Sequence, residues 1–232
     1  MIEDPPVLTV NRRLTRPAAL LVERLRGAQT GHVVDALGGA GALAASIKPV
    51  PGATAAMLTL CGPALTCACA PGDHLGLVAA LAEAKPGDVI VIATEGYLGT
   101  AVVGDLMMGI ARNRKLEGLV TDGAVRDVEG IIDVGRPVFC AGISPNSPAK
   151  TGLGTVGLPV TLGGVAIASG DVLVGDRNGV VVVPQARLAE VVEALDRVRA
   201  LEDTVMKQVA EGLIYPERWK SLLRPERIRY IE

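Results

Sequence analysis

The segment from residue 103 to residue 135, VGDLMMGIARNRKLEGLVTDGAVRDVEGIIDVG, alternates helical and strand patterns. Apolar residues recur at helical spacing over 106–111, which predicts an amphipathic helix. Residues 119–121 form a short apolar run, which predicts a buried strand. A second short helix should open near Arg126 and end at Gly135. Helices that alternate with buried strands indicate a layered α/β fold.

Two acids and an arginine mark the points where predicted strands give way to predicted helices. Asp105 is expected as the N-cap of the first helix, and Arg126 and Asp127 open the second. The first N–H groups of a helix lack intrahelical partners and the helix dipole is positive there, so such an edge gathers anionic ligands. The three side chains could hold a divalent cation and a carboxylate together. The alternative is that Asp105 serves only as a cap and the other two only as a surface ion pair.

Further strand and helix patterns lie on both sides of this segment. Asp73 is expected to start one helix, and an Asn-Gly turn is expected to close a hairpin between two valine-rich runs. The predicted elements are helices over 18–26, 33–37 and 75–84, strands over 64–70, 89–93 and 138–140, and one long helix over 185–211.

Size and composition predict one compact domain with appended ends. The chain has 232 residues, and 49% of them are hydrophobic, which is enough for a sizeable core. We expect an N-terminal arm over 1–17, a single α/β domain over 18–212 and a C-terminal arm over 213–232.

The same composition excludes several partners. One Trp, one Phe and three Tyr provide no platform on which nucleobases could stack, and a net charge of −2 disfavours a phosphate backbone. No apolar run approaches the roughly 20 residues of a membrane span, and the N-terminus lacks the regions of a signal peptide. We therefore expect no nucleic acid, no membrane contact and a cytoplasmic location.

The long helix predicts an oligomer. A helix over 185–211 would extend for about 40 Å, which is longer than a domain of this size needs to cover one sheet. Part of it should pack on another copy of the chain. The tail beyond it contains Pro216 and Pro225 and is too polar to form its own core, so it is expected to lie on a neighbouring subunit.

Cysteines and histidines give weak signals. Cys67 and Cys69 are poorly placed for a disulfide in one strand, and we expect all four cysteines to be reduced core thiols. His32 and His74 are too few for a three-histidine zinc site, and each is expected to serve as a local hydrogen-bonding group.

The central segment carries a family resemblance. GDLM at 104–107 and VTDGAVRD at 120–127 resemble the signature of the 4-hydroxy-4-methyl-2-oxoglutarate / 4-carboxy-4-hydroxy-2-oxoadipate aldolase family, which includes the regulator of ribonuclease activity A. The resemblance implies a swivelling β/β/α fold in trimers or hexamers. Its other motifs are HVVDALG at 32–38, IKP at 47–49, CGPA at 61–64, KPGDVIV at 85–91, GD at 170–171, GVVVVP at 179–184 and the AEGL tail at 210–213. The chain departs from the family pattern after Asp73, so the resemblance does not indicate which distal group of the substrate the protein recognises.

Such aldolases cleave a carbon–carbon bond beside a 2-oxo acid and pass through a pyruvate enolate. A lysine Schiff base or a metal can stabilise the enolate, and a Schiff-base lysine needs an apolar setting that lowers its pKa. Oxygen ligands would suit a hard ion such as Mg²⁺ or Mn²⁺. The metal route is favoured because every lysine lies beside a proline, a turn or a charged helix face: Lys48, Lys85, Lys115, Lys150, Lys207 and Lys220.

The resemblance also implies a role for each site residue. Asp127 would bind the metal, and Asp105 would position a water on it. Arg126 would bind the oxygen that becomes the enolate. Glu202 of a neighbouring subunit would assist transfer of the 4-hydroxyl proton. The pyruvyl carboxylate would bind at the start of the first helix, to a backbone formed by Gly104, Leu106 and Met107.

Two classes of function are open on the sequence alone. The first is a metal-dependent pyruvate aldolase that cleaves a small 4-hydroxy-2-oxo diacid and also decarboxylates oxaloacetate through the same enolate. The second is a non-catalytic regulator that binds a ribonuclease. Glu202 and the aldolase-like tail favour the enzyme. Another 2-oxo acid lyase that uses the same metal centre is a third alternative.

Overall fold

The computed structural model describes residues 7–219 and 222–231. The chain divides into two compact units, 1–195 and 196–232, which are described separately. Residues 1–6 of the predicted N-terminal arm, and residues 220, 221 and 232 of the predicted C-terminal arm, lie outside the described residues. The predicted domain boundary at 212 differs from this division, which falls inside the long helix.

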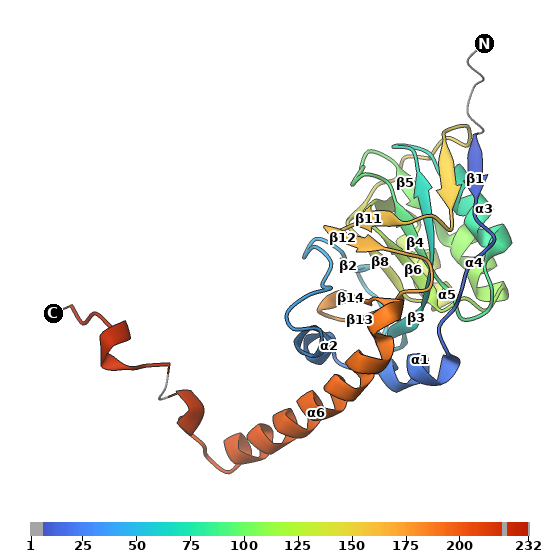
Figure 1. Ribbon diagram of the computed structural model, residues 1–232. Coiled ribbons are helices and arrows are strands. Elements are labelled where there is room, and N and C mark those ends of the chain that lie inside the picture. The colour runs from blue at the N-terminus through green and yellow to red at the C-terminus, as the bar shows by residue number, and fades with distance from the viewer. Residues whose placement is uncertain (1–6, 220–221, 232) are drawn as a thin grey trace. The chain divides into compact units, whose positions relative to one another are not determined.

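The first unit is built on a mixed sheet whose longest strand is β3 (Figure 1). The second half of β3 pairs in parallel with β4, which pairs with β6, which pairs with β8, while the first half of β3 pairs with the β13–β14 hairpin. The strands of this sheet are β1 (Leu8–Val10), β10 (Gly154–Val156), β3 (Leu60–Cys69), β4 (Val89–Ala93), β6 (Gly118–Thr121), β8 (Val138–Cys140), β2 (Lys48–Pro49), β13 (Val172–Asp176) and β14 (Gly179–Val183).

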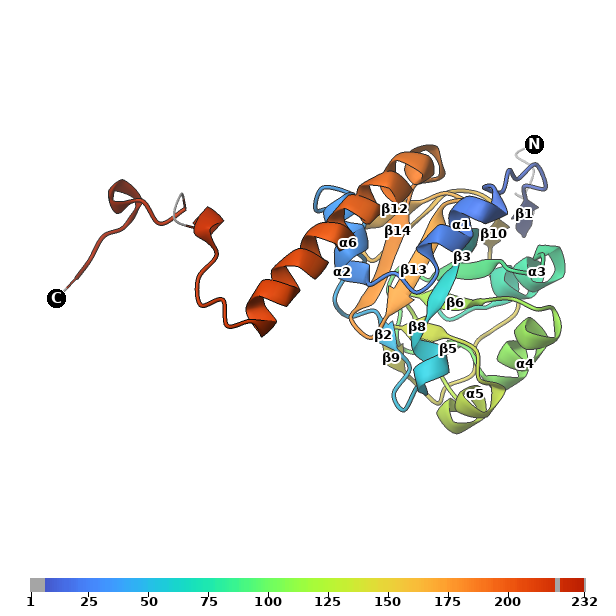
Figure 2. The same ribbon diagram turned by 90° about the horizontal axis from the view of Figure 1, so that it is seen from below.

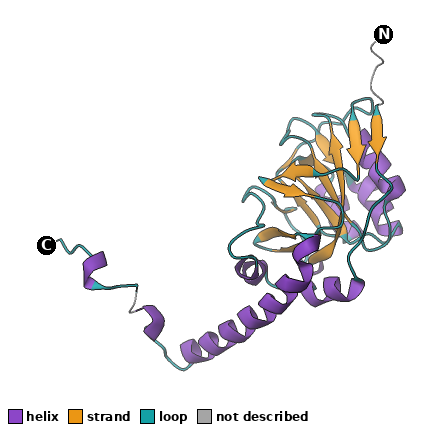
Figure 3. Ribbon diagram, viewed as in Figure 1, coloured by secondary structure: helices purple, strands orange, loops and turns teal. Residues whose placement is uncertain are grey.

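Two smaller sheets complete the β structure. One is a parallel sheet in which β7 lies between β5 and β9, and the other is a short antiparallel hairpin of β11 and β12 (Figure 3). These strands are β5 (Ala101–Val103), β7 (Ala124–Val125), β9 (Gly142–Ile143), β11 (Val160–Leu162) and β12 (Val165–Ile167).

Helices cover both sides of the sheets. Figure 2 shows α3, α4 and α5 gathered on one side, while α2 lies beside β13 and β14 and α1 lies beside β3. The helices of the first unit are α1 (Ala19–Leu25), α2 (Thr30–Ala36), η1 (Ala55–Leu58), α3 (Leu75–Glu83), α4 (Asp105–Asn113), α5 (Val128–Val134), η2 (Gln185–Arg187) and the start of α6 (Leu188–Ala210). The second unit holds the rest of α6, η3 (Glu217–Trp219) and η4 (Pro225–Arg227).

The central strands are buried on both faces, which explains their continuous apolar runs. Successive side chains of a strand point to opposite faces, so Ile90 and Ile92 of β4 pack with the α3–α5 layer. Val89 and Val91 pack instead against the second β layer, which includes Leu173 of β13. The layered β/β/α fold predicted from the sequence is confirmed, and no helix of the described residues is long and apolar enough to cross a membrane.

Two predictions were wrong, the cap position of Asp105 and the start of the strand at residue 64. Asp105 is the first residue of α4 and Gly104 holds the cap position, so Asp105 is not the N-cap. Part of the predicted N-terminal arm is strand β1, which pairs with β10. The strand predicted over 64–70 begins earlier, at Leu60, because its first half pairs with the hairpin. The prediction of reduced core cysteines is confirmed, since all four are buried and free.

The chain before α1 is fixed to the first unit by a bidentate ion pair. Arg16 Nε and Nη2 donate to Asp88 Oδ1 and Oδ2 at 2.8 and 2.6 Å. The Asp88 side chain is only 1% exposed, and its Oδ2 also accepts from the backbone N–H of Lys85 at 2.8 Å. A carboxylate buried this deeply needs its charged partner.

We therefore predict that Arg16→Ala lowers the free energy of unfolding by about 2–3 kcal/mol, because it leaves the Asp88 carboxylate buried and unpaired. Urea unfolding followed by circular dichroism would measure the change. Arg12→Ala is the matched control, because Arg12 pairs with Glu83 from a position that is 77% exposed. Equal losses in the two variants would contradict the assigned role of Asp88 burial.

Candidate active site

A cleft of about 470 Å³ lies where the small parallel sheet ends. Its strands β5 and β7 run in the same direction, with Ala101 opposite Ala124 and Val103 opposite Val125. Parallel strands end at the same edge, so the residues that follow them become neighbours. The cleft is lined by β5 and the residues that follow it, by the residues that follow β7, by the loop after β9, and by His74 at the start of α3.

Two glycines make room for the two acids of this edge. A Cβ on Gly104 would lie 2.6 Å from Asp127 Oδ2, and a Cβ on Gly130 would lie 2.7 Å from Asp105 Oδ2. Asp127 caps α5 in the left-handed backbone region, with φ of 56°, which an aspartate tolerates better than most residues. The starts of α4 and α5 therefore lie against each other, with one carboxylate at each.

Arg126 is held from two sides. Its Nε lies 3.2 Å from Asp127 Oδ2, and its Nη1 donates to Ser147 Oγ at 2.5 Å. About a third of its side chain is exposed. The guanidinium is thus positioned in the cleft with donors left for a ligand, since it carries five N–H groups.

The start of α4 differs in one respect from the prediction. The backbone N–H of Leu106 donates to Asp105 Oδ1 at 2.6 Å, so it is not free for a carboxylate. The N–H of Met107 belongs to the same first turn, where intrahelical acceptors are missing. Of the predicted anion-binding groups, Met107 is the one that suits the role in this conformation.

A buried carboxylate fixes the opposite wall. Asp73 accepts hydrogen bonds from the N–H groups of Leu75, Thr151 and Gly152 at 2.7, 2.7 and 2.8 Å. Burial raises the pKa of the Asp73 carboxyl, but the three N–H groups outweigh burial and hold the pKa below its ordinary value. These bonds tie the loop that carries Lys150 to the start of α3, so Lys150 and His74 line one cleft.

Sequence reasoning missed part of this wall. Gly130, Ser147 and Lys150 were not predicted as site residues, and His74 was predicted only as a local hydrogen-bonding group. The one local signal was the Asp73-His74 pair at a predicted helix start. Ser147 and Lys150 follow β9, a strand of two residues that is too short to recognise from its pattern.

Glu202 is not among the described residues that line this cleft. It lies on α6 in the second unit, and the described lining of the cleft comes from the first unit. The placement of Glu202 at a catalytic site therefore stays a prediction.

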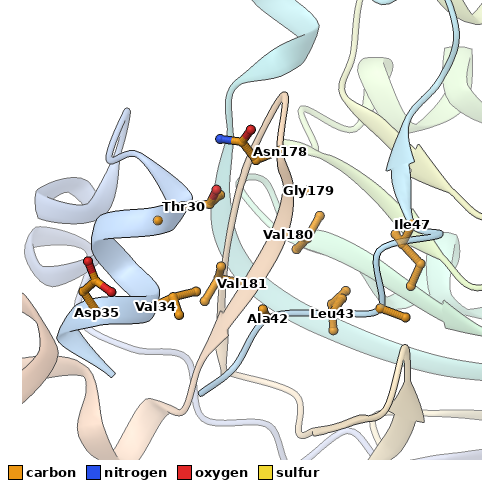
Figure 4. A pocket seen from close by; sticks show the side chains of 12 residues that line it. Thr30, Val34, Asp35, Ala42, Leu43, Ile47, Asn178, Gly179, Val180 and Val181 are labelled. Carbon is orange, nitrogen blue, oxygen red and sulfur yellow. The ribbon is translucent and has the colours of Figure 1, made fainter. Parts of the chain in front are cut away.

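A second hollow of about 340 Å³ lies between α2 and the β13–β14 hairpin (Figure 4). Val34, Leu43 and Val180 make it largely apolar, and Asp35 is the one ionisable residue of its described lining. The hydroxyl of Thr30 is already bonded to Asp176 at 2.9 Å. This hollow offers no converging set of polar groups, so the first cleft is the stronger candidate site.

The donors of the first cleft fit a hard divalent cation. Asp127 and Asp105 supply carboxylate oxygens, and the two glycines keep the space beside them clear. No group of three or more His, Cys, Asp or Glu that could hold a metal occurs among the described residues. Mg²⁺ and Mn²⁺ suit such a site, because they are commonly bound through one or two carboxylates and keep several waters.

The fold and the site together define an α/β protein that presents acids and an arginine at the carboxyl edge of parallel strands. A sequence model of the RraA-like family, described as Aldolase/RraA, matches residues 30–182. The chain belongs to this family.

Relatives with known names or structures agree with the assignment. A protein of Halalkalibacterium halodurans named "Putative 4-hydroxy-4-methyl-2-oxoglutarate aldolase" is 36% identical over 205 residues, which cover 84% of this chain and 96% of that protein. An uncharacterized protein of Pseudomonas syringae has a similar structure, with a TM-score of 0.73, 29% identity, and coverage of 86% of this chain and 96% of the other. The RNA-processing inhibitor RraA from Thermus thermophilis gives a TM-score of 0.61 and 27% identity, and the match covers 68% of this chain and 93% of that one.

We predict that Gly130→Ala weakens Mn²⁺ binding by about tenfold or more, because the added Cβ would displace the Asp105 carboxylate from its place in the cleft. Titration of Mn²⁺ followed by electron paramagnetic resonance would measure the affinity. The matched control is Gly109→Ala on α4, where an added Cβ meets no atom within 4 Å. Unchanged Mn²⁺ affinity in a folded Gly130→Ala protein would show that the position of Asp105 is irrelevant to the metal.

Proposed function

We propose that this protein is a divalent-metal-dependent (class II) pyruvate aldolase. It would cleave 4-hydroxy-4-methyl-2-oxoglutarate or 4-carboxy-4-hydroxy-2-oxoadipate to pyruvate and a second oxo acid, and would decarboxylate oxaloacetate as a side activity. The observation that carries the proposal is Arg126 beside Asp127, in one cleft with Asp105 and the first turn of α4. The name of the 36% identical relative supports the same substrate class.

The lysines of the chain support the metal route over a Schiff base. Every lysine that the structure describes is exposed, including Lys150 in the cleft. A Schiff-base lysine needs burial that lowers its pKa. Asp127 would hold Mg²⁺ or Mn²⁺ with Asp105 beside it, and the bound ion would supply Lewis-acid stabilisation of the enolate charge.

Other residues of the cleft would bind the substrate and assist proton transfer. The first turn of α4, through the N–H of Met107, would bind the carboxylate next to the 2-oxo group. Arg126 would donate to the 2-oxo oxygen, where negative charge develops in the transition state. Asp105 would orient a water that accepts the 4-hydroxyl proton.

The bond changes follow from this placement. Loss of the 4-hydroxyl proton is accompanied by cleavage of the C3–C4 bond, and the electron pair of that bond passes to the pyruvate enolate. The 4-hydroxyl carbon leaves as a ketone, and C3 of the enolate then takes up a proton to give pyruvate. Oxaloacetate would lose carbon dioxide from the same carbon and form the same enolate, so both reactions would use Arg126 in the same way.

The purified protein is predicted to release pyruvate from 4-hydroxy-4-methyl-2-oxoglutarate and from oxaloacetate, to lose both activities with EDTA and to regain them with Mg²⁺ or Mn²⁺. Arg126→Lys should lower kcat by about 10²–10³-fold, because a point charge does not reproduce the guanidinium fork. A coupled pyruvate assay measures each step. Borohydride in the presence of pyruvate should leave the protein active.

The controls separate the alternatives. Inactivation by borohydride plus pyruvate would assign a Schiff base and make Lys150 the first lysine to test. Decarboxylation of oxaloacetate without cleavage of either 4-hydroxy-2-oxo diacid would favour another 2-oxo acid lyase on this centre. Protein that is inert with every 2-oxo acid and every metal would favour the non-catalytic ribonuclease regulator.

We further propose that the protein is a homo-oligomer, a trimer or a hexamer, in which the C-terminal arm packs on a neighbouring copy and Glu202 serves that copy's site. Within the second unit, α6 carries Leu201, Met206 and Val209, which are 56%, 60% and 49% exposed. Exposed apolar side chains in such numbers on one helix suit an interface with another chain.

Shared sites predict complementation. Glu202→Ala and Arg126→Ala proteins should each be inactive, whereas a mixture that has exchanged subunits should regain activity, because some sites would combine an intact Arg126 with an intact Glu202. Pyruvate release after subunit exchange, verified by native mass spectrometry, measures the recovery. Verified exchange without recovery would contradict catalysis across subunits.

A further inference from the structure

His74 presents a buried ring nitrogen that the fold leaves unpaired. The residue is only 8% exposed, and its Nε2 has no hydrogen-bond partner among the described residues. Buried polar atoms are nearly always paired, because an unpaired one loses its bonds to water without replacement. An exception at the wall of a candidate active site calls for a ligand group that supplies the missing bond.

The position of the ring hydrogen decides which kind of group that must be. The backbone of Val102 acts as an acceptor toward the ring, which raises the pKa of the His74 imidazole less than burial lowers it. Burial, together with the positive charge of Lys150, lowers the pKa of the His74 imidazole, so the ring is neutral near pH 7. A neutral ring with hydrogen on Nδ1 has only a lone pair on Nε2, which makes that atom an acceptor.

Backbone hydrogen bonds tie His74 to the loop that carries Lys150. The N–H of His74 donates to the carbonyl of Ala149 at 3.1 Å, and the N–H of Ala149 donates to Gly72 at 2.8 Å. Asp73, the neighbouring residue, anchors Thr151 and Gly152. The ring of His74 therefore moves with the same loop that carries Lys150.

We propose that the His74 ring carries its hydrogen on Nδ1, that Nε2 accepts a hydrogen bond from a hydroxyl group of the bound ligand until that hydrogen turns to the water beside Asp105, and that Lys150 pairs with the ligand's distal carboxylate. This inference rests on the proposed function and deepens it. In a 4-hydroxy-2-oxo diacid at neutral pH, the carboxylates and the oxo group only accept hydrogen bonds, and the 4-hydroxyl is the single donor. An acceptor in the wall thus matches the one group that distinguishes an aldol substrate from a simple 2-oxo diacid.

Access to Nε2 requires a side chain to move. The atom is covered in this conformation, and the cationic groups that act on the ring are Lys150 and Arg126. Lys150 has an exposed, long and flexible side chain in the same cleft, so its ammonium group can turn toward a distal carboxylate.

Binding of two analogues that cannot be cleaved tests the inference. In the presence of Mg²⁺, wild-type protein should bind 2,4-dihydroxyglutarate about tenfold more tightly than 2-hydroxyglutarate, because the pair differs only in the 4-hydroxyl group. His74→Phe keeps a ring of similar size without a nitrogen, and its preference should fall to about one. His74→Gln can place its amide oxygen near the position of Nε2 and should retain part of the preference. Isothermal titration calorimetry measures each ratio.

Lys150→Met is the matched control in the same cleft. It should weaken both analogues by similar factors, because both have the distal carboxylate, and it should leave the hydroxyl preference intact. A wild-type ratio of one, or the same preference in His74→Phe as in wild type, would overturn the assignment and would mean that Nε2 is satisfied by water. Because the readout is a binding ratio, it is separate from pyruvate release: intact release with no hydroxyl preference removes only the role of His74.

Discussion

The parallel pairing of β5 with β7 is the constraint on which the candidate site depends. Each strand is very short, yet both are fully buried and end at the same edge. The ladder continues beyond them, since the N–H of Arg126 donates to the carbonyl of Val103 at 3.1 Å. The pairing therefore brings residues from two turns of the chain, more than 20 positions apart in sequence, to the same cleft. Strand β9 joins the same sheet and brings Ser147 to Arg126.

Because Gly104 and Gly130 have no side chains, this edge has room for two carboxylates. At Gly104 and Gly130 any side chain would meet a carboxylate of the other turn at less than 3 Å. Two carboxylates in one cleft are the kind of ligand through which Mg²⁺ and Mn²⁺ are commonly bound, so the clearance at these glycines suits a cation-binding edge.

The family contains proteins named for catalysis and proteins named for regulation of RNA processing. Their common fold does not decide between these activities, because function depends on the groups in the site. Here the cleft combines an arginine fork, two acids, an unpaired imidazole nitrogen and a lysine. A surface that only bound another protein would not require a buried, unpaired imidazole nitrogen, so the composition of the cleft favours a small polar ligand.

The sequence by itself determined the layers, the main strands and three of the site residues. Continuous apolar runs such as 89–93 predict strands buried on both faces, and Asp105, Arg126 and Asp127 stand at helix starts that local patterns predict. Local patterns extend only over a few residues, which is why Asp105 was wrongly placed as a cap and why β5, β7 and β9 were not foreseen. Strands of two or three residues carry too few side chains for a period of two to be visible. Only the tertiary structure decided that Gly130 faces Asp105, that Ser147 reaches Arg126 and that His74 lines the same cleft. Each of these contacts joins segments whose closeness comes from sheet pairing and from the Asp73 carboxylate, and neither can be derived from the residues next to them in sequence.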